Sequence, residues 1–135
     1  MAVEFDLNIR NKILTLEIKG EWDEEERPPR LYKATMDVAN TFKAQGLIVI
    51  NGVKGDITLM EAREVGSMSS MAPSLVGVAY VPTDFPDKSR VPKFTIAKTV
   101  SSLLNAPFQV FYDEAEAKRW IVDRISKTET LEYID

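Results

Sequence analysis

Apolar and polar residues alternate with a period of two over residues 3–9, and the alternation resumes over residues 14–19. Such alternation is typical of strands that bury one face and expose the other. A short polar stretch, residues 10–12, separates the two runs. The pattern therefore predicts an N-terminal β-hairpin.

Beyond the hairpin, short apolar runs alternate with stretches in which apolar residues recur every three or four positions. The runs are typical of strands covered on both faces, and the three-four spacing is typical of amphipathic helices. The first helix is expected to bury a stripe formed by Leu31, Ala34, Val38 and Phe42. Residues 51–56 are expected to form a loop. The predicted helices cover residues 30–46, 58–72, 94–104 and 113–126, and the predicted strands cover residues 47–50, 75–81 and 108–112.

Two of the helix starts carry capping sequences. Thr58 precedes Glu61 by three residues, the spacing of a capping box in which each side chain satisfies a free backbone amide of the other residue. Asp113 and Glu116 repeat this spacing before the last helix. The inner face of that helix is expected to hold Ala117, Trp120, Ile121 and Ile125.

The order of these elements predicts the fold class. Strands that alternate with helices favour an α/β domain with a mixed, mostly parallel sheet, an N-terminal hairpin and about four covering helices. We expect one domain over residues 1–126 and a C-terminal tail over residues 127–135.

Composition narrows the chemistry. The chain has 135 residues, 17 basic and 21 acidic, for a net charge of −4, and it contains no cysteine and no histidine. Those two absences exclude Ser-His-Asp and Cys-His triads, thiol redox chemistry and the common zinc sites. We expect no structural metal and no cofactor.

The sequence also bears on location. Glu4 and Asp6 fall where a signal peptide needs an apolar core. The longest apolar run, residues 75–81, is far shorter than the roughly 20 residues of a membrane helix. We expect a cytoplasmic protein without membrane insertion.

Three stretches resemble the STAS superfamily (sulfate transporter and anti-sigma factor antagonist domains), and within it the SpoIIAA-like subgroup. They are GVKGDIT at residues 52–58, Lys93-Phe94, and VFYDEAEAKRWI at residues 110–121. The resemblance covers roughly residues 3 to 125. It implies a STAS/SpoIIAA-like fold and a regulatory role exerted through protein contact.

The resemblance also singles out a hydroxyl group. Phosphorylated members of this superfamily carry an Asp-Ser-Ser/Thr-Gly signature at the start of the helix after the central strand. The corresponding stretch here reads Gly55-Asp56-Ile57-Thr58, with no glycine after Thr58. Thr58 is interpreted as a helix cap, and phosphorylation of Thr58 is the alternative.

Two loops are expected to share one edge of the sheet. Ligands and partners of open α/β sheets gather outside the carboxyl ends of parallel strands. The loops that follow residues 47–50 and 75–81 leave such ends and are rich in glycine, proline and charge. We hypothesise a binding surface there; a capped helix start and a solvated basic loop are the structural alternatives. Its residues are Lys54, Asp56, Thr58, Lys88 and Arg90.

Methionines on or near the second helix suggest a further surface. Flexible thioethers suit adaptable apolar binding sites, although they fill cores more often. Met60 lies outside the apolar stripe of its helix. An apolar groove that includes Met60 and Met68 is therefore a hypothesis beside the core-filling interpretation.

These observations favour a non-enzymatic regulatory or protein-interaction module whose partner is another protein or a second copy of the chain. The alternative is a protein that binds a small apolar or anionic ligand between the second and third helices. Four basic residues between positions 88 and 112 are too few to indicate nucleic-acid binding in a chain of this charge. Asp56 and Glu61 form an acidic pair, but no nucleophile accompanies them in the sequence, so we expect no enzyme.

Overall fold

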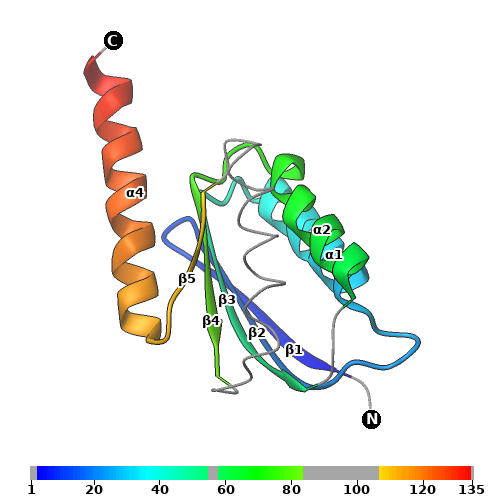
Figure 1. The fold of residues 1–135 in the computed structure, drawn as a ribbon. Helices are drawn as coiled ribbons and strands as arrows, with labels where there is room; N and C mark the ends of the chain where they lie inside the picture. The colour runs from blue at the N-terminus through cyan, green and yellow to red at the C-terminus, as the bar shows by residue number, and fades with distance from the viewer. Residues whose placement is uncertain (1–2, 55–57, 84–106, 135) are drawn as a thin grey trace.

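Figure 1 shows the computed structural model, which describes residues 3–54, 58–83 and 107–134. In the described part, five strands form one sheet in the order β1-β2-β3-β4-β5. β1 is antiparallel to β2, and each following pair is parallel. This arrangement confirms the predicted α/β class with an N-terminal hairpin and a mostly parallel sheet. The elements are β1 (Glu4–Arg10), β2 (Ile13–Glu21), α1 (Pro28–Thr41), β3 (Gly46–Lys54), α2 (Leu59–Ser67), the 3₁₀ helix η1 (Met68–Met71), β4 (Gly77–Pro82), β5 (Phe108–Val110) and α4 (Glu114–Ile134).

Helices cover both faces of the sheet. Helices α1 and α2 lie together on one face, and α4 lies on the other (Figure 1). Leu14, Leu16 and Ile18 of β2 are buried in the cluster that includes residues of α1 and η1. On the opposite face, Ile48 and Ile121 belong to a second cluster beneath α4. The sheet therefore separates two apolar cores, as expected when parallel strands are covered on both sides.

The hairpin turns on two residues. Arg10 pairs with Ile13, and the intervening Asn11 and Lys12 have φ angles of 54° and 66°. Positive φ at both central positions is the signature of a type I′ turn, whose twist matches that of the flanking strands. The carbonyl oxygen of Lys12 also accepts hydrogen bonds from the backbone N–H groups of Gln45, at 2.7 Å, and Gly46, at 3.2 Å. This contact fixes the start of β3 beside the turn.

The expectation of a loop over residues 51–56 is wrong for residues 51–54, because β3 continues through Lys54, and residues 55 and 56 lie outside the described residues. Residues 51–54 pair in register with residues 18–21 of β2. The Asn51 side-chain amide donates to the hydroxyl group of Tyr80, and its oxygen accepts from the Val53 N–H at 2.9 Å. Asn51 and Val53 are both buried. Strand pairing and this buried polar contact override the loop propensity of the Asn-Gly pair.

The expected stripe of the first helix is also partly wrong. Ala34 is exposed and Phe42 is 62% exposed, whereas Leu31 is buried as expected. The buried face of α1 is rotated relative to this stripe because its residues join one core cluster with residues of the sheet and of η1. Its buried residues are Pro28, Leu31, Tyr32, Thr35, Met36 and Ala39.

Helix α4 matches the expected inner face. Ala117 and Ile121 are fully buried, and Trp120 and Ile125 pack against the same cluster. The helix begins at Glu114, and the carboxylate of the preceding Asp113 accepts from the Ala115 N–H at 3.0 Å.

The segment expected as a tail, from residue 127, is helical through Ile134. Figure 1 shows the C-terminal end of α4 rising past the sheet. The described residues contain three α-helices and η1. The helix expected over residues 94–104 lies outside the described residues, so the expectation of about four helices is tested only in part.

Candidate functional site

The beginnings of α1 and α2 meet at the carboxyl ends of the parallel strands (Figure 1). Arg27 is the N-cap residue of α1, and Glu61 lies in the first turn of α2. The Arg27 Nε donates to Glu61 Oε2 at 2.8 Å, and Nη2 donates to Oε1 at 2.6 Å. Two parallel N–H···O bonds of this kind give both strength and a fixed geometry. The ion pair therefore holds the two helix starts in a defined relation.

The predicted capping box is present at the same place. The Glu61 N–H donates to Thr58 Oγ1 at 3.1 Å, and the Thr58 N–H donates to Glu61 Oε1 at 2.9 Å. The Glu61 carboxylate thus accepts from both Arg27 and the Thr58 backbone. One side chain caps its own helix and also ties that helix to α1.

The electrostatics follow from these contacts. The hydrogen bonds from Arg27 lower the pKa of Glu61 from its ordinary value of 4.5 to about 2, against the opposing effect of burial and with support from the Thr58 N–H. The same hydrogen bond raises the pKa of Arg27. The Glu61 side chain is 16% exposed and the Arg27 side chain 33% exposed. Glu61 is therefore ionised throughout the neutral range, and its carboxylate is engaged as an acceptor rather than poised to take a proton.

Apolar side chains flank the capped turn. Leu59 is 46% exposed and Met60 is 79% exposed. Met68, in contrast, is 6% exposed and belongs to the core beneath α1 and α2. The structure does not bring Met60 and Met68 together on one exposed surface. Leu59 and Met60, at the beginning of α2, are adjacent apolar side chains that are both exposed to solvent.

Only part of the surface hypothesised from the sequence falls in the described residues. Thr58 is exposed, and its side-chain oxygen accepts a hydrogen bond in the capping box. Lys54 is the last residue of β3, where its backbone pairs with Glu21. Asp56, Lys88 and Arg90 lie outside the described residues, so their distances to Thr58 stay untested.

Arg27 is a residue of this site that no sequence motif marks. Arg27 lies 34 residues from Glu61 and follows a run of acidic residues, so no local spacing links the two. The only sequence signal is its place immediately before Pro28, because proline favours the first turn of a helix. That signal locates the helix start but says nothing of the partner.

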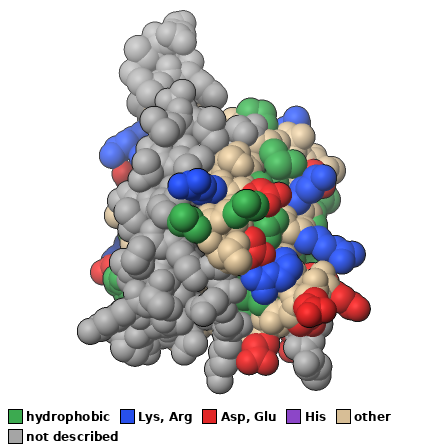
Figure 2. Space-filling model, turned by 45° about the vertical axis from the view of Figure 1, so that its right-hand side comes forward, with side chains coloured by type: hydrophobic (Ala, Val, Ile, Leu, Met, Phe, Trp, Pro, Cys, Tyr) green, Lys and Arg blue, Asp and Glu red, His purple; other side chains and the backbone are tan. Residues whose placement is uncertain are grey.

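The acidic run before Arg27 forms an ordered turn. The Asp23 carboxylate accepts from the backbone N–H groups of Glu25, at 2.9 Å, and Glu26, at 2.7 Å. Figure 2 shows acidic side chains gathered at the lower end of the face that it presents. Among the described residues, no group of three or more Asp or Glu side chains is placed to hold a metal ion.

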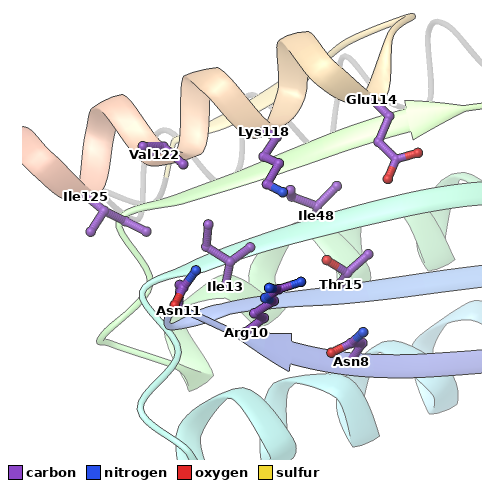
Figure 3. Close-up of a pocket in the computed structure, with 10 residues that line it drawn as sticks. All are labelled: Asn8, Arg10, Asn11, Ile13, Thr15, Ile48, Glu114, Lys118, Val122 and Ile125. Carbon is purple, nitrogen blue, oxygen red and sulfur yellow. The ribbon is translucent and has the colours of Figure 1, made fainter.

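A groove of about 580 Å³ lies on the other face of the sheet, between α4 and the β1–β2 hairpin (Figure 3). Arg10 reaches into it from β1 and Lys118 from α4, above an apolar floor that includes Ile13 and Ile48. The ligand-binding alternative places its pocket between the second and third helices. This groove is therefore a different feature, separated by the sheet from the capped start of α2.

No helix in the described ranges is both long enough and apolar enough to cross a membrane.

Comparisons with known proteins rest on structure alone. No protein-family model matches the chain, and no curated protein matches its sequence. The crystal structure of an anti-sigma factor antagonist from Mycobacterium paratuberculosis aligns with a TM-score of 0.59 at 11% sequence identity, over 89% of this chain and 94% of that chain. At this identity the likeness concerns the fold. The chain has the fold of an anti-sigma factor antagonist, as its resemblance to the STAS superfamily implied.

Proposed function

We propose that the protein is a non-enzymatic regulatory module that acts by binding another protein through the N-terminal part of α2. The likeness to an anti-sigma factor antagonist supports the regulatory class, since that protein is named for its action within a set of regulators. A shared fold alone does not fix function, so the proposal depends on the site.

One observation carries the proposal: Met60 is 79% exposed on the first turn of a helix whose start is rigidly held. Methionine is enriched at protein interfaces relative to the rest of the surface, and binding energy there concentrates in a few side chains. Methionine adapts its shape to a partner because its side chain is unbranched and flexible. The ion pair with Arg27 and the capping box hold the first turn of α2 in place, and the exposed Leu59 side chain extends the apolar surface.

Thr58 gives this surface a means of control. A phosphate on its hydroxyl group would add up to two negative charges beside the Glu61 carboxylate. Like-charge repulsion would oppose the capping box, and the phosphate would compete with Glu61 for Arg27. Thr58 therefore stays our candidate phosphorylation site. Lys54 and Asp56 precede it in the chain, and with Lys88 and Arg90 they complete the proposed binding surface.

Site-specific crosslinking tests the proposal, because it captures whichever protein contacts the chosen position. A photoreactive amino acid replaces Met60 in one variant and Val122, which is 49% exposed on α4, in a matched control. We expect illumination in cells to join one protein to position 60 but not to position 122, and Leu59→Asp to abolish that product. Identical products from both positions, or none from position 60, would contradict the proposal.

Native mass spectrometry addresses the ligand-binding alternative on the same preparation. A small molecule of constant mass that copurifies with the chain would favour the carrier. Its absence, together with a specific product from position 60, would favour the protein-binding module.

A further inference from the structure

Strand β1 is the long edge strand of the sheet that the described residues form. It stands at one end of the sheet, and its outer side pairs with no strand within the part of the chain that the structure describes. It spans seven residues in unbroken register with β2, without a proline or a bulge. Proteins usually shorten, kink or cover such edges because their unpaired backbone groups template association with another chain.

Apolar side chains line this edge on the α1–α2 side of the sheet. Phe5 is 56% exposed, Ile9 is 37% exposed, and Leu7 between them is half-buried. Their cross-strand partners on β2 are all buried in the core: Ile18, Leu16 and Leu14. The apolar row of the core thus continues onto β1 and is left partly uncovered there.

The backbone of the same residues faces outward. A two-residue turn closes on a hydrogen-bonded pair, here Arg10 with Ile13, and such pairs alternate along an antiparallel ladder. The alternation directs the N–H and C=O groups of Phe5, Leu7 and Ile9 away from β2. These groups are therefore available to pair with a further strand.

The sequence of the strand is self-complementary about Leu7. When a second copy lies antiparallel with the two Leu7 residues opposed, Phe5 faces Ile9 of the second copy and Glu4 faces its Arg10. Both pairs form twice. The apolar pairs share one face of the joined sheet, and the opposite charges meet on the other.

Other registers match less well. A shift by one residue would swap the apolar and charged faces. A shift by two residues in one direction opposes Asp6 with Asp6 of the second copy, and in the other direction it leaves Glu4 and Phe5 without their complementary residues. The register centred on Asn8 still opposes Asp6 with Arg10 and Leu7 with Ile9, but it pairs only residues 6–10 of the strand. The register centred on Leu7 pairs all seven residues of β1 and matches both its apolar and its charged positions.

We propose that β1 is a homodimerisation edge, at which two copies of the chain pair their β1 strands antiparallel about Leu7 and join their sheets. The proposal goes beyond the protein-binding role of α2. Its test involves neither Met60 nor Thr58, so either proposal can fail alone.

A charge-reversal experiment tests the edge in solution. Sedimentation equilibrium of the full chain should give twice the mass of one chain. Glu4→Arg and Arg10→Glu each replace two opposite-charge pairs with two like-charge pairs per dimer. Each should therefore weaken dimerisation about tenfold, and the double variant should recover it. Glu24→Arg, on the acidic loop, is the matched control and should dimerise as the native chain does.

A disulfide trap tests the register. Because the chain has no cysteine, Leu7→Cys carries a single thiol, which lies opposite its counterpart in the proposed dimer. The spacing of opposed residues in an antiparallel pair fits a disulfide. Mild oxidation should join Leu7→Cys into disulfide-linked dimers and leave Glu24→Cys without a covalent link, as denaturing gel electrophoresis without reductant would show.

Circular dichroism confirms that each variant is folded before its mass is compared. The proposal would be overturned if the native chain remained monomeric at about 100 μM. It would also be overturned if neither charge reversal weakened the dimer, or if the double reversal failed to restore dimerisation. Equal crosslinking of the two cysteine variants would overturn the register.

Discussion

Arg27 and Glu61, 34 residues apart in the chain, join the N-terminal ends of α1 and α2 through hydrogen bonds of 2.8 and 2.6 Å. Arg27 is the N-cap residue of α1, yet its side chain makes no capping bond to that helix. It serves the neighbouring helix instead. The contact thus holds the two helix starts in one fixed arrangement. We place the binding surface at these helix starts.

The first prediction concerns pH. Because the pKa of Glu61 is lowered from 4.5 to about 2 on folding, the folded state holds this proton more weakly than the unfolded state does. The stabilisation that the ionised Glu61 carboxylate contributes is fully present above about pH 4.5 and is lost as the pH falls toward 2. Glu61→Gln should lower the free energy of unfolding at pH 7 by about 2 kcal/mol, after allowance for solvent screening.

Urea unfolding of the native chain and Glu61→Gln at pH 7, 4.5, 3 and 2.5 measures the effect. The difference between the two proteins should shrink steadily below pH 4.5. Glu24→Gln, on the acidic loop, provides the control. A difference in the free energy of unfolding that stays constant from pH 7 to pH 2.5 would show that the ion pair does not account for the stability of the two helix starts.

The second prediction concerns the cap of α2. Thr58→Val keeps the shape of the side chain but removes the oxygen that accepts from the Glu61 N–H. Loss of an N-cap acceptor costs about 1 kcal/mol. Thr58→Ser, which retains the hydroxyl group, should stay within a few tenths of a kcal/mol of the native chain. Chemical denaturation distinguishes the two, and equal stability of both variants would count against the cap.

The third prediction couples Gly46 and Ile121. A Cβ atom at Gly46 would collide with Cγ2 of Ile121, which is fully buried. Gly46→Ala should destabilise the protein by about 1–3 kcal/mol through overpacking, and Ile121→Ala should cost about 2–5 kcal/mol through the cavity that it leaves. Because the alanine at position 121 removes the colliding atom, the double variant should cost less than the sum. Additive costs in thermal or urea unfolding would contradict this packing.

The fourth prediction concerns the hairpin turn. Lys12 adopts a φ angle of 66°, which disfavours residues with a Cβ atom. Lys12→Gly creates the Asn-Gly pair that type I′ turns prefer, and it should stabilise the protein by about 0.5–1 kcal/mol. Lys19→Gly, in the interior of β2, should destabilise it. An unchanged or lowered midpoint of unfolding in Lys12→Gly would argue against the type I′ turn.

The sequence by itself determined the features that depend on neighbours a few residues away. The hairpin over residues 3–19 follows from period-two alternation, because a strand with one solvated face must alternate. The capping box at Thr58 and Glu61 follows from a spacing of three residues, and the inner face of α4 around Ile121 follows from helical spacing. Each of these signals is contained in one short segment.

Only the tertiary structure decided features that depend on distant contacts. Residues 51–54 extend β3 because they pair with β2 and because the buried Asn51 side chain donates a hydrogen bond to the Tyr80 hydroxyl group. Arg27 finds Glu61 because the sheet brings two helix starts together, and no local pattern encodes a contact across 34 residues. A local pattern reports which side chains could be buried together, but burial itself depends on which surfaces the folded chain brings into contact.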